Sequence, residues 1–242
     1  MDNPWFYYPE TIAGHIAALD EASAKHAVQV LRLKEGDTIH LTNGAGLLHT
    51  ATIQAAGKKQ CSVQIISTEE RARQTHRQVA MAISPLKNTS RFEWFLEKAT
   101  ELGVAEIFPI ISHRTVREHF RQERLQTICV SAMLQSQQTW LPTLHKPQSY
   151  EQLIAQQSAN SPQRYHHRWI AHCMHSEKHH LVQAVKTGMQ DSLLLIGPEG
   201  DFTETEVMTA EAEGFVAVSL GDTRLRTETA GVVAASLLCL LP

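Results

Sequence analysis

The chain has 242 residues, of which 43% are hydrophobic and 19% are charged, and its formal net charge is −3. This composition is ordinary for a soluble chain that forms two modest domains or one large domain. The first residues lack the basic segment and apolar core of a signal peptide, and no apolar run is long enough to span a membrane, so we expect a cytoplasmic protein with no membrane partner.

Residues 1 to about 70 have the pattern of a small β-rich unit. Asp20 to Leu31 favours a short helix, and Asn43-Gly44 is typical of a hairpin turn. Strand patterns occur at residues 38–42, 47–54 and 61–66. We therefore expect a small β-barrel, followed by a polar linker over residues 69–78.

The charges are distributed unevenly along the chain. Lys and Arg number 5 against 8 Asp and Glu in residues 1–70, 11 against 6 in residues 71–146, and 6 against 11 in residues 147–242. A basic middle between acidic flanks could direct a polyanion to one region. A solvated surface of mixed charge is the alternative.

From residue 79 onward, strand and helix patterns alternate. A capping box at Ser90 and Glu93 indicates the start of the first helix of this part. Strands are expected at residues 79–84, 104–111 and 165–171, and helices from Phe92 to Leu102 and at residues 125–138, 149–157 and 176–187. Such alternation predicts an α/β domain with a parallel sheet and right-handed crossovers.

The stretch from residue 192 to residue 241 is the most informative. Leu193–Ile196 predicts a buried strand, and a capping box at Thr203 and Glu206 predicts a helix that ends near Gly214. A second buried strand is expected at residues 215–220. The last helix, over residues 228–241, is apolar nearly all round, so we expect it to pack inside the protein.

Two loops follow the carboxyl ends of these two strands. One carries Gly197-Pro-Glu-Gly200 and the other carries Leu225-Arg-Thr-Glu-Thr229. Open α/β sheets bind ligands at that edge, so we expect a small-molecule site there, although glycines can also simply make tight turns. Neither loop has a phosphate-binding glycine motif, and a ligand with a cationic centre fits better.

Three motifs in these loops resemble the RsmE family of 16S ribosomal RNA uridine N3-methyltransferases, which belongs to the SPOUT superfamily. They are Ile196-Gly-Pro-Glu-Gly200, Leu220-Gly221 and Leu225-Arg-Thr-Glu-Thr-Ala230. Lys25-His26 and the run Val30–Asp37 are similar to the family's N-terminal domain. The resemblance implies an α/β fold, in which residues 71–242 form a SPOUT-type trefoil-knotted parallel-sheet domain. Before it, residues 1–70 would form a PUA-like β-barrel that binds RNA.

The resemblance also implies S-adenosylmethionine as cofactor, 16S ribosomal RNA or the small ribosomal subunit as partner, and a homodimer. Asp201 departs from the family's commoner glycine at that place. The residues expected to hold the cofactor are Ala171, His172, Ile196, Gly197, Pro198, Glu199, Gly200, Leu220, Gly221, Leu225, Arg226, Thr227 and Ala230.

Methyl transfer to uridine N3 requires that the N3 proton leave and that the developing negative charge be stabilised. Arg226 is the candidate for stabilisation because its guanidinium stays charged and offers planar donors. Glu228 or Glu199 could accept the proton. The alternative for Glu199 is that it orients the cofactor or accepts a hydrogen bond from a backbone amide. The alternative for Arg226 and Glu228 is an ion pair or dimer contact that shapes the loop.

Seven basic residues are candidates for RNA contacts. For Arg32 and Lys34 the alternative is a plain polar turn, because Lys34-Glu-Gly-Asp37 is also a turn sequence. The complete set is Lys25, His26, Arg32, Lys34, Arg91, Arg114 and Arg117.

No metal site is expected. Six histidines crowd residues 166–180, but the sequence lacks an H-E-x-x-H motif and a close Cys/His set, and its four cysteines are scattered.

Two other functions stay open. A related superfamily branch methylates ribose 2′-oxygens, but Asn88-Thr-Ser-Arg91 does not fit its Asn-x-Gly-x-x-x-Arg signature. The chain could also be a ribosome-assembly factor that binds RNA without catalysis.

Overall fold

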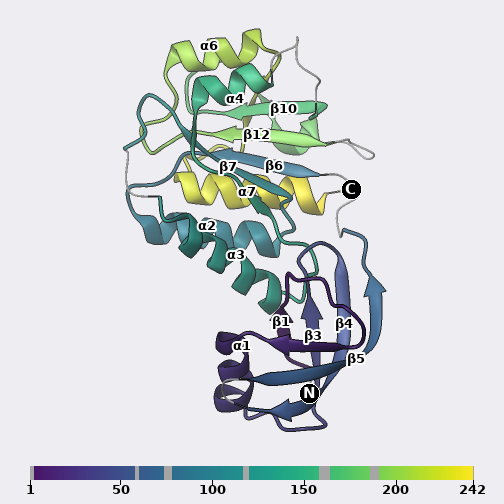
Figure 1. Ribbon diagram of the computed structural model, residues 1–242. Coiled ribbons are helices and arrows are strands. Elements are labelled where there is room, and N and C mark those ends of the chain that lie inside the picture. The colour runs from purple at the N-terminus through teal and green to yellow at the C-terminus, as the bar shows by residue number, and fades with distance from the viewer. Residues whose placement is uncertain are drawn as a thin grey trace. The chain divides into compact units, whose positions relative to one another are not determined.

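The computed structural model describes residues 3–57, 60–73, 78–116, 120–157, 164–185 and 191–241. The chain forms two compact units, Met1–Arg73 with Met133–Leu141 and Gln74–Ala132 with Pro142–Pro242 (Figure 1). The sequence predicted one boundary near residue 70 and no return to the first unit. Within the described ranges, no helix is long and apolar enough to cross a membrane.

The first unit is built on a five-stranded mixed sheet in the order β1-β3-β4-β5-β2. The three predicted strands are present, whereas β1 and β2 are too short to give a strand pattern. The predicted linker is partly wrong, because Glu69 and Glu70 still pair with Leu48 and Leu47. The strands are β1 (Trp5–Tyr7), β2 (Ile16–Leu19), β3 (Thr38–Thr42), β4 (Leu47–Ala56) and β5 (Cys61–Glu70).

The predicted hairpin joins β3 to β4. The Asn43 side-chain oxygen accepts hydrogen bonds from the backbone N–H groups of Ala45, at 2.8 Å, and Leu47, at 3.1 Å. Gly44 and Gly46 both have positive φ, +71° and +99°. The turn therefore uses two left-handed residues and is longer than a two-residue loop.

The backbone of residues 133–141 joins the first unit at this hairpin. The Gly46 N–H donates to the Thr139 carbonyl, and the Leu141 N–H donates to the Gly44 carbonyl, each at 2.8 Å. The Trp140 indole also donates to the Arg71 carbonyl at 2.8 Å. Neither partner segment has a strand pattern that would have predicted this pairing.

The predicted helix at residues 20–31 is present in two parts. Asp20 caps α1 (Glu21–Lys25), and the chain then continues as a π-helix over His26–Val30. Shortly after it, Arg32 has a φ of +57°. A non-glycine residue in this left-handed region marks local strain, which is often found where side chains have a function.

The second unit contains a parallel sheet in the order β11-β13-β10-β12-β6-β7-β8, with β9 paired to β7. All its strand pairs are parallel, which confirms the predicted fold class. The trefoil knot stays a prediction. The strands are β6 (Val79–Ile83), β7 (Glu106–Ile111), β8 (Thr143–Leu144), β9 (Gln148–Ser149), β10 (His167–Ala171), β11 (His179–His180), β12 (Ser192–Ile196) and β13 (Val216–Ser219).

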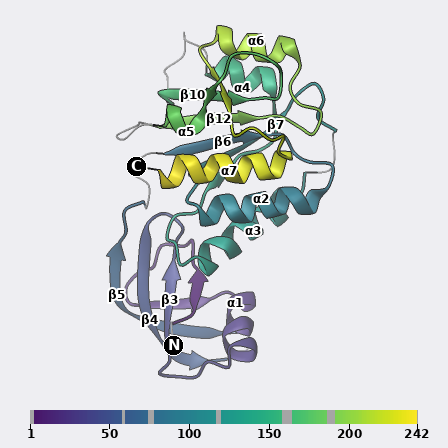
Figure 2. The same ribbon diagram turned by 180° about the vertical axis from the view of Figure 1, so that it is seen from behind.

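Helices cover both faces of this sheet. In Figures 1 and 2, α2 and α7 lie on one face, and α4 and α6 lie on the other. Ala80 and Ala82 of β6 pack in the core under α4 and α6, as expected for alternate residues of one strand. The helices are α2 (Thr89–Glu101), α3 (Gln122–Gln135), α4 (Tyr150–Gln156), α5 (Leu181–Ala184), α6 (Glu204–Ala212) and α7 (Thr227–Leu240).

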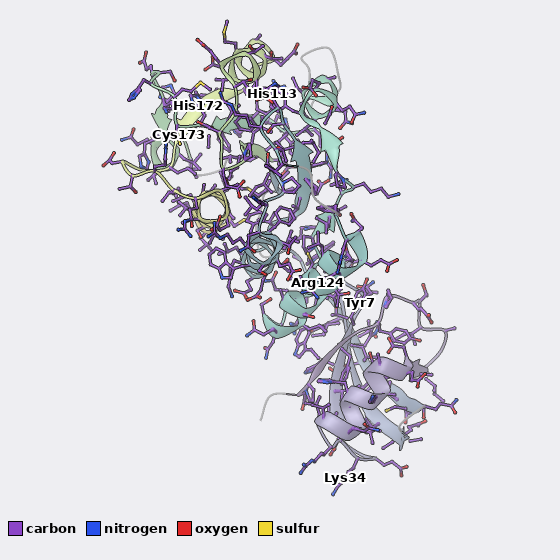
Figure 3. All side chains as sticks on the ribbon, turned by 90° about the vertical axis from the view of Figure 1, so that its left-hand side faces the viewer. Tyr7, Lys34, His113, Arg124, His172 and Cys173 are labelled. Carbon is purple, nitrogen blue, oxygen red and sulfur yellow. The ribbon has the colours of Figure 1, made fainter. Side chains whose placement is uncertain are left out.

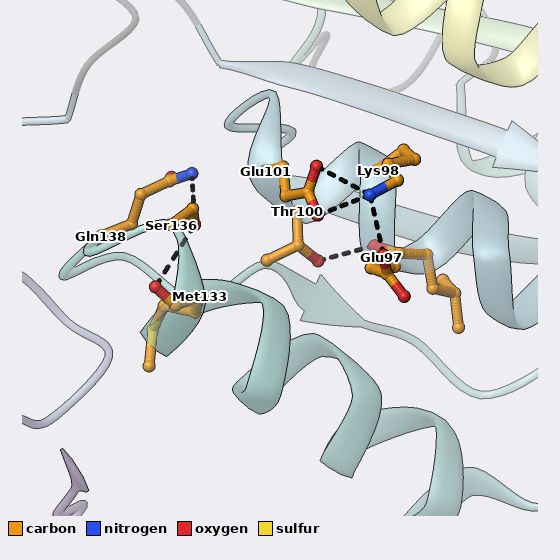
Figure 4. A network of polar contacts seen from close by, with 8 residues as sticks. Glu97, Lys98, Thr100, Glu101, Met133, Ser136 and Gln138 are labelled. Atoms are coloured by element: carbon orange, nitrogen blue, oxygen red, sulfur yellow. Dashed lines mark hydrogen bonds and ion pairs between the residues drawn. The ribbon is translucent and has the colours of Figure 1, made fainter. Parts of the chain in front are cut away.

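Helix starts agree with the sequence prediction at α4 and α6 but not at α2. The capping boxes Ser149/Gln152 and Thr203/Glu206 both form. The box predicted at Ser90 and Glu93 is wrong, because Asn88 caps α2 by accepting from the Ser90 N–H at 3.0 Å. On the outer side of α2, Lys98 pairs with Glu97 and Glu101 (Figure 4).

Three other helix predictions need correction. Helix α3 begins and ends three residues before the predicted 125–138. The helix predicted at residues 176–187 is mostly wrong, since His179 and His180 pair with β13 and only the short α5 follows; residues 186 and 187 lie outside the described residues. Helix α7 is not fully inside the protein: Ala234 and Ala235 are buried, but Leu240 is 68% exposed.

A buried carboxylate, Glu106, lies at the start of β7, away from the edge where the strands end. It accepts hydrogen bonds from Tyr165 and Arg164, at 2.9 and 3.0 Å, and bonds the His145 ring at 2.9 Å. Burial alone would raise the pKa of Glu106, but these bonds and the Arg164 charge outweigh it, so its pKa lies below the usual value. The cluster therefore stabilises the ionised form.

Candidate cofactor and active site

Three neighbouring strands end at the same level of the sheet. In the register, Ala171 at the end of β10 lies opposite both Ile196 of β12 and Val218 of β13. The loops that follow these strands begin side by side, because parallel strands bring their carboxyl ends to one edge. The two predicted ligand loops and the Ala171-His172 loop thus meet.

A cavity of about 780 Å³ lies between these loops. Every residue that the sequence predicted to hold the cofactor lines it. Most of the residues that were missed are neighbours in the same loops. Lys178 had no signal in the sequence; it lies at the end of the loop after β10, where its ammonium donates to the His172 and Met174 carbonyls at 3.0 and 2.7 Å. The additional lining residues are Cys173, Lys178, Asp201, Val218, Ser219, Asp222, Thr223 and Arg224.

The loop after β12 is held closely by its surroundings. A Cβ atom at Gly197 would lie 3.1 Å from the Phe202 ring and backbone, and one at Gly200 would lie 3.3 Å from the Arg114 side chain. The Arg114 guanidinium donates to the Gly200 carbonyl at 2.8 Å. Arg114, a predicted RNA contact, therefore supports the cavity loop.

Asp201 joins two of the cavity loops. Its φ is +63°, a conformation that suits glycine. One carboxylate oxygen accepts from the Cys173 N–H at 2.8 Å, and the other accepts from the Phe202 N–H at 2.9 Å. The carboxylate thus links the loop after β12 to the loop after β10.

His172 lies buried in the wall of the cavity. Figure 3 shows it with Cys173 at one end of the second unit, away from Arg124. Neither ring nitrogen has a hydrogen-bond partner among the described residues. Burial, with the nearby Lys178 charge, lowers the pKa of His172. The neutral ring, with one donor and one acceptor, is therefore favoured and is available to a ligand.

The loop after β13 lines the cavity with the backbone of Gly221 and the charged side chain of Arg226. Gly221 has a φ of +144°, and a Cβ atom there would meet nothing within 4 Å. Arg226 is exposed at the start of α7 and makes no ion pair within the described ranges. Open backbone and an uncommitted guanidinium are features that a polar ligand can use.

The two candidate carboxylates lie in different places. Glu199 is exposed and lines the cavity. Glu228 is buried and is absent from the cavity lining; one of its oxygens lies 3.6 Å from Nε of Arg91, and the other has no partner among the described residues. The ion pair that was considered for Glu228 therefore exists, and it also engages Arg91.

The remaining predicted RNA contacts lie in the first unit, with one exception. Lys25, His26, Arg32 and Lys34 are all exposed near the π-helix. The Lys34 N–H donates to the Asp37 carboxylate at 2.7 Å, so this segment is also the polar turn that was the alternative. Arg117 lies outside the described residues.

No metal site is evident in the part of the chain that the structure describes, where no group of three or more His, Cys, Asp or Glu side chains could hold an ion. The crowded histidines include His179 and His180, which form β11.

Comparisons with known proteins identify the family. The model of a protein family described as "RNA methyltransferase domain" matches residues 73–239 of this chain. The chain belongs to this RNA methyltransferase family. An RNA methyltransferase PUA domain also matches residues 19–66, so the first unit is PUA-like.

Relatives of the family align with nearly the whole chain. A Synechocystis protein named ribosomal RNA small subunit methyltransferase E is 29% identical over 231 residues, which are 93% of this chain and 73% of that protein. A Porphyromonas gingivalis structure, described as a probable rRNA-methyltransferase, is 35% identical with a TM-score of 0.87, covering 96% of this chain and 95% of that one.

A Neisseria gonorrhoeae ribosomal RNA small subunit methyltransferase E, solved bound to S-adenosyl methionine, is 28% identical with a TM-score of 0.85 and covers 97% of this chain and 96% of its own. These names confirm the resemblance to the RsmE family that the loop motifs indicated.

Proposed function

We propose that this chain transfers a methyl group from S-adenosylmethionine to N3 of a uridine in 16S ribosomal RNA. The observation that carries this proposal is the cavity at the shared edge of β10, β12 and β13, which is lined by three loops and contains Arg226. Membership of the RNA methyltransferase family and the likeness to a structure bound to S-adenosyl methionine support it.

The chemistry of the cavity suits this cofactor. S-adenosylmethionine supplies an electrophilic methyl group on a cationic sulfur, together with an adenine, a ribose and an amino acid end. The wall carries three carboxylates, Glu199, Asp201 and Asp222, which can face a cationic sulfur, and three cations, Lys178, Arg224 and Arg226, which can face the carboxylate of the amino acid end. The neutral His172 ring and the open backbone at Gly221 can bond the polar edges of the cofactor.

Arg226 is the residue that we assign to the developing charge on the uracil. Loss of the N3 proton leaves negative charge shared with the neighbouring carbonyl oxygens. The Arg226 guanidinium, at the start of α7, can donate to such an oxygen in the transition state, where the charge is greatest. A lysine at this position would keep the charge but lose the planar pair of donors.

Glu199 is the better candidate for accepting the N3 proton. A general base must come within hydrogen-bond reach of the proton, and Glu199 lines the cavity whereas Glu228 does not. We assign Glu228 a positioning role, since its ion pair with Arg91 connects the start of α7 to the start of α2. The pH profile of methyl transfer should therefore change in Glu199→Gln and keep its shape in Glu228→Gln.

The PUA-like unit is the proposed platform for the ribosomal RNA. Lys25, Arg32 and Lys34 offer exposed positive charge close together in the chain, and phosphate contacts of this kind position an RNA without reading its sequence. Of these three residues, Arg32 alone has a left-handed and therefore strained backbone.

We also propose that the chain is a homodimer in which α7 contributes to the interface. Leu240 of α7 is 68% exposed and Trp94 of the adjacent α2 is 42% exposed, so apolar surface is left uncovered beside the buried face of α7. Sedimentation should give twice the chain mass of 27.1 kDa. Leu240→Glu should weaken the dimer, whereas Met208→Glu on α6, a residue that is 63% exposed, should not.

The proposed reaction is tested by incubating the protein with methyl-labelled S-adenosylmethionine and 16S ribosomal RNA, free or in the small subunit. The RNA is then digested, and its nucleosides are separated by mass spectrometry. Label in 3-methyluridine that falls strongly in Arg226→Ala, and only partly recovers in Arg226→Lys, is the expected result. Label in a 2′-O-methyl nucleoside, or none at all, would contradict the proposal.

A further inference from the structure

A second cavity, of about 740 Å³, lies at the same edge of the sheet as the proposed cofactor site, one strand away. Ile83 at the end of β6 is opposite Ile196 at the end of β12, and the Ser84 N–H donates to the Ile196 carbonyl at 3.1 Å. The loop after β6 therefore begins beside the loop after β12. This loop and the starts of α2 and α3 form the cavity, which we call the α2–α3 groove. It is lined by Pro85, Leu86, Thr89, Ser90, Phe92, Glu93, Phe120, Arg121, Arg124 and Leu125.

The floor of the α2–α3 groove is aromatic. Phe92 is buried, and Phe120 is half-buried with its ring at 65° to that of Phe92 and 6.1 Å from it. This edge-to-face contact holds Phe120 in place without covering its whole face. A held, partly open aromatic ring is the kind of platform on which the bases of single-stranded RNA stack.

The rim of the groove is positively charged. Glu93 is already paired with Arg124 by two hydrogen bonds of 2.6 and 2.9 Å, and this bonding lowers the pKa of Glu93. Arg121 lines the groove and Lys87 lies in the loop beside it; both are exposed, and neither forms an ion pair within the described ranges. Positive charge thus exceeds negative charge at the rim, which suits a phosphate backbone.

The groove is also connected to the proposed active site. Ser90 and Phe92 line the groove on either side of Arg91, whose ion pair with Glu228 reaches the start of α7. Thr227, next to Glu228, lines the cofactor cavity. A strand bound in the groove would therefore lie beside the helix start that carries Arg226.

We infer that the α2–α3 groove binds a single-stranded segment of the substrate RNA, with a base stacked on Phe120 and its phosphate at Arg121. The inference rests on the proposed function, because it gives the RNA strand a place next to the cofactor. It also accounts for part of the basic middle of the chain, residues 71–146, which carries 11 Lys and Arg against 6 Asp and Glu.

The test measures binding of a fluorescein-labelled oligouridylate to the full chain by anisotropy at several salt concentrations. Phe120→Ala should weaken binding by roughly 5- to 100-fold, as expected for the loss of one stacked base, and Phe120→Tyr should retain it. Arg121→Ala should reduce the slope of log affinity against log salt by about one. Glu93→Gln, which frees Arg124, should strengthen binding.

Two controls make the outcome specific. Lys146→Ala removes an exposed cation of the same unit that does not line the groove, and it should change neither affinity nor slope. S-adenosylmethionine affinity, measured by calorimetry, should be equal in all variants, which shows that they fold. Unchanged oligouridylate affinity in both Phe120→Ala and Arg121→Ala would overturn the inference, and a simultaneous loss of the dimer would identify the groove as a self-contact.

Methyl transfer separates this inference from the proposed function. If the unmodified protein methylates 16S ribosomal RNA while the groove variants keep its KM and the oligouridylate affinity, the groove inference alone fails. If the unmodified protein transfers no methyl group but the groove variants lose RNA affinity, the proposed function fails and the groove inference stands.

Discussion

Asp201 provides the sharpest test of how the cofactor cavity is held together. Its backbone is left-handed, with a φ of +63°, and its side chain accepts from the Cys173 N–H at 2.8 Å. Asp201→Gly relieves the backbone but removes the hydrogen bonds from the Cys173 and Phe202 N–H groups, and Asp201→Ala removes both bonds while keeping the strain. The two partly exposed hydrogen bonds contribute about 1 kcal/mol each, and a left-handed alanine costs about 1–2 kcal/mol.

These magnitudes predict an order. Asp201→Gly should be nearly as stable as the unmodified chain, because the two effects offset each other. Asp201→Ala should be about 1–2 kcal/mol less stable than Asp201→Gly, which for a chain of this size lowers the thermal midpoint by roughly 2–8 °C. Differential scanning calorimetry of the three proteins measures this order. Equal midpoints for the alanine and glycine variants would refute the left-handed backbone.

The same variants separate stability from binding. Both lose the link between the loop after β12 and Cys173, so both should bind S-adenosylmethionine more weakly, whatever their thermal midpoints. Titration calorimetry measures this affinity. A glycine variant with unchanged affinity would show that the link does not position the cavity loops.

Three further variants test other parts of the structure. Glu106→Gln should flatten the dependence of unfolding free energy on pH below pH 4.5, since the lowered pKa of Glu106 gives stability that is lost as the pH falls through its folded value; an unchanged urea-denaturation profile would contradict this. Gly221→Ala should weaken S-adenosylmethionine binding about tenfold by calorimetry, whereas Gly14→Ala, also at positive φ, should not. Gly231→Ala should lower the thermal midpoint, because its Cβ would lie 2.6 Å from the Phe95 ring and overpacking of about 1–3 kcal/mol exceeds the helix-propensity gain of about 1 kcal/mol; a higher midpoint would refute this packing.

Features with a local cause could be predicted from the sequence. Glycines after apolar runs indicate strand ends, and the Thr203/Glu206 capping box fixes the start of α6 whatever the tertiary structure. Because parallel strands end at one edge, these local signals were enough to bring the two ligand loops together. The predicted start of α2 is wrong for an equally local reason, since Asn88 competes with Ser90 for the N-cap position.

Features that depend on residues distant in the sequence could not be predicted. Arg114 reads as an exposed basic residue until its packing over Gly200, 86 residues away, is known. Arg91 and Glu228 were separate candidates, and only the contact of α2 with α7 joins them. Lys178 lies in the cavity wall because its ammonium donates to the His172 and Met174 carbonyls. The next two residues pair with β13 where a helix had been expected, since strand pairing outweighs local propensity there.

The proposed reaction is tested most directly in cells that lack this gene. Their 16S ribosomal RNA, digested and measured by mass spectrometry, should contain no 3-methyluridine. The unmodified gene should restore the nucleoside, and the Arg226→Ala variant, expressed at the same level, should not. A 3-methyluridine signal that is the same with and without the gene would contradict the proposal that this chain methylates uridine N3.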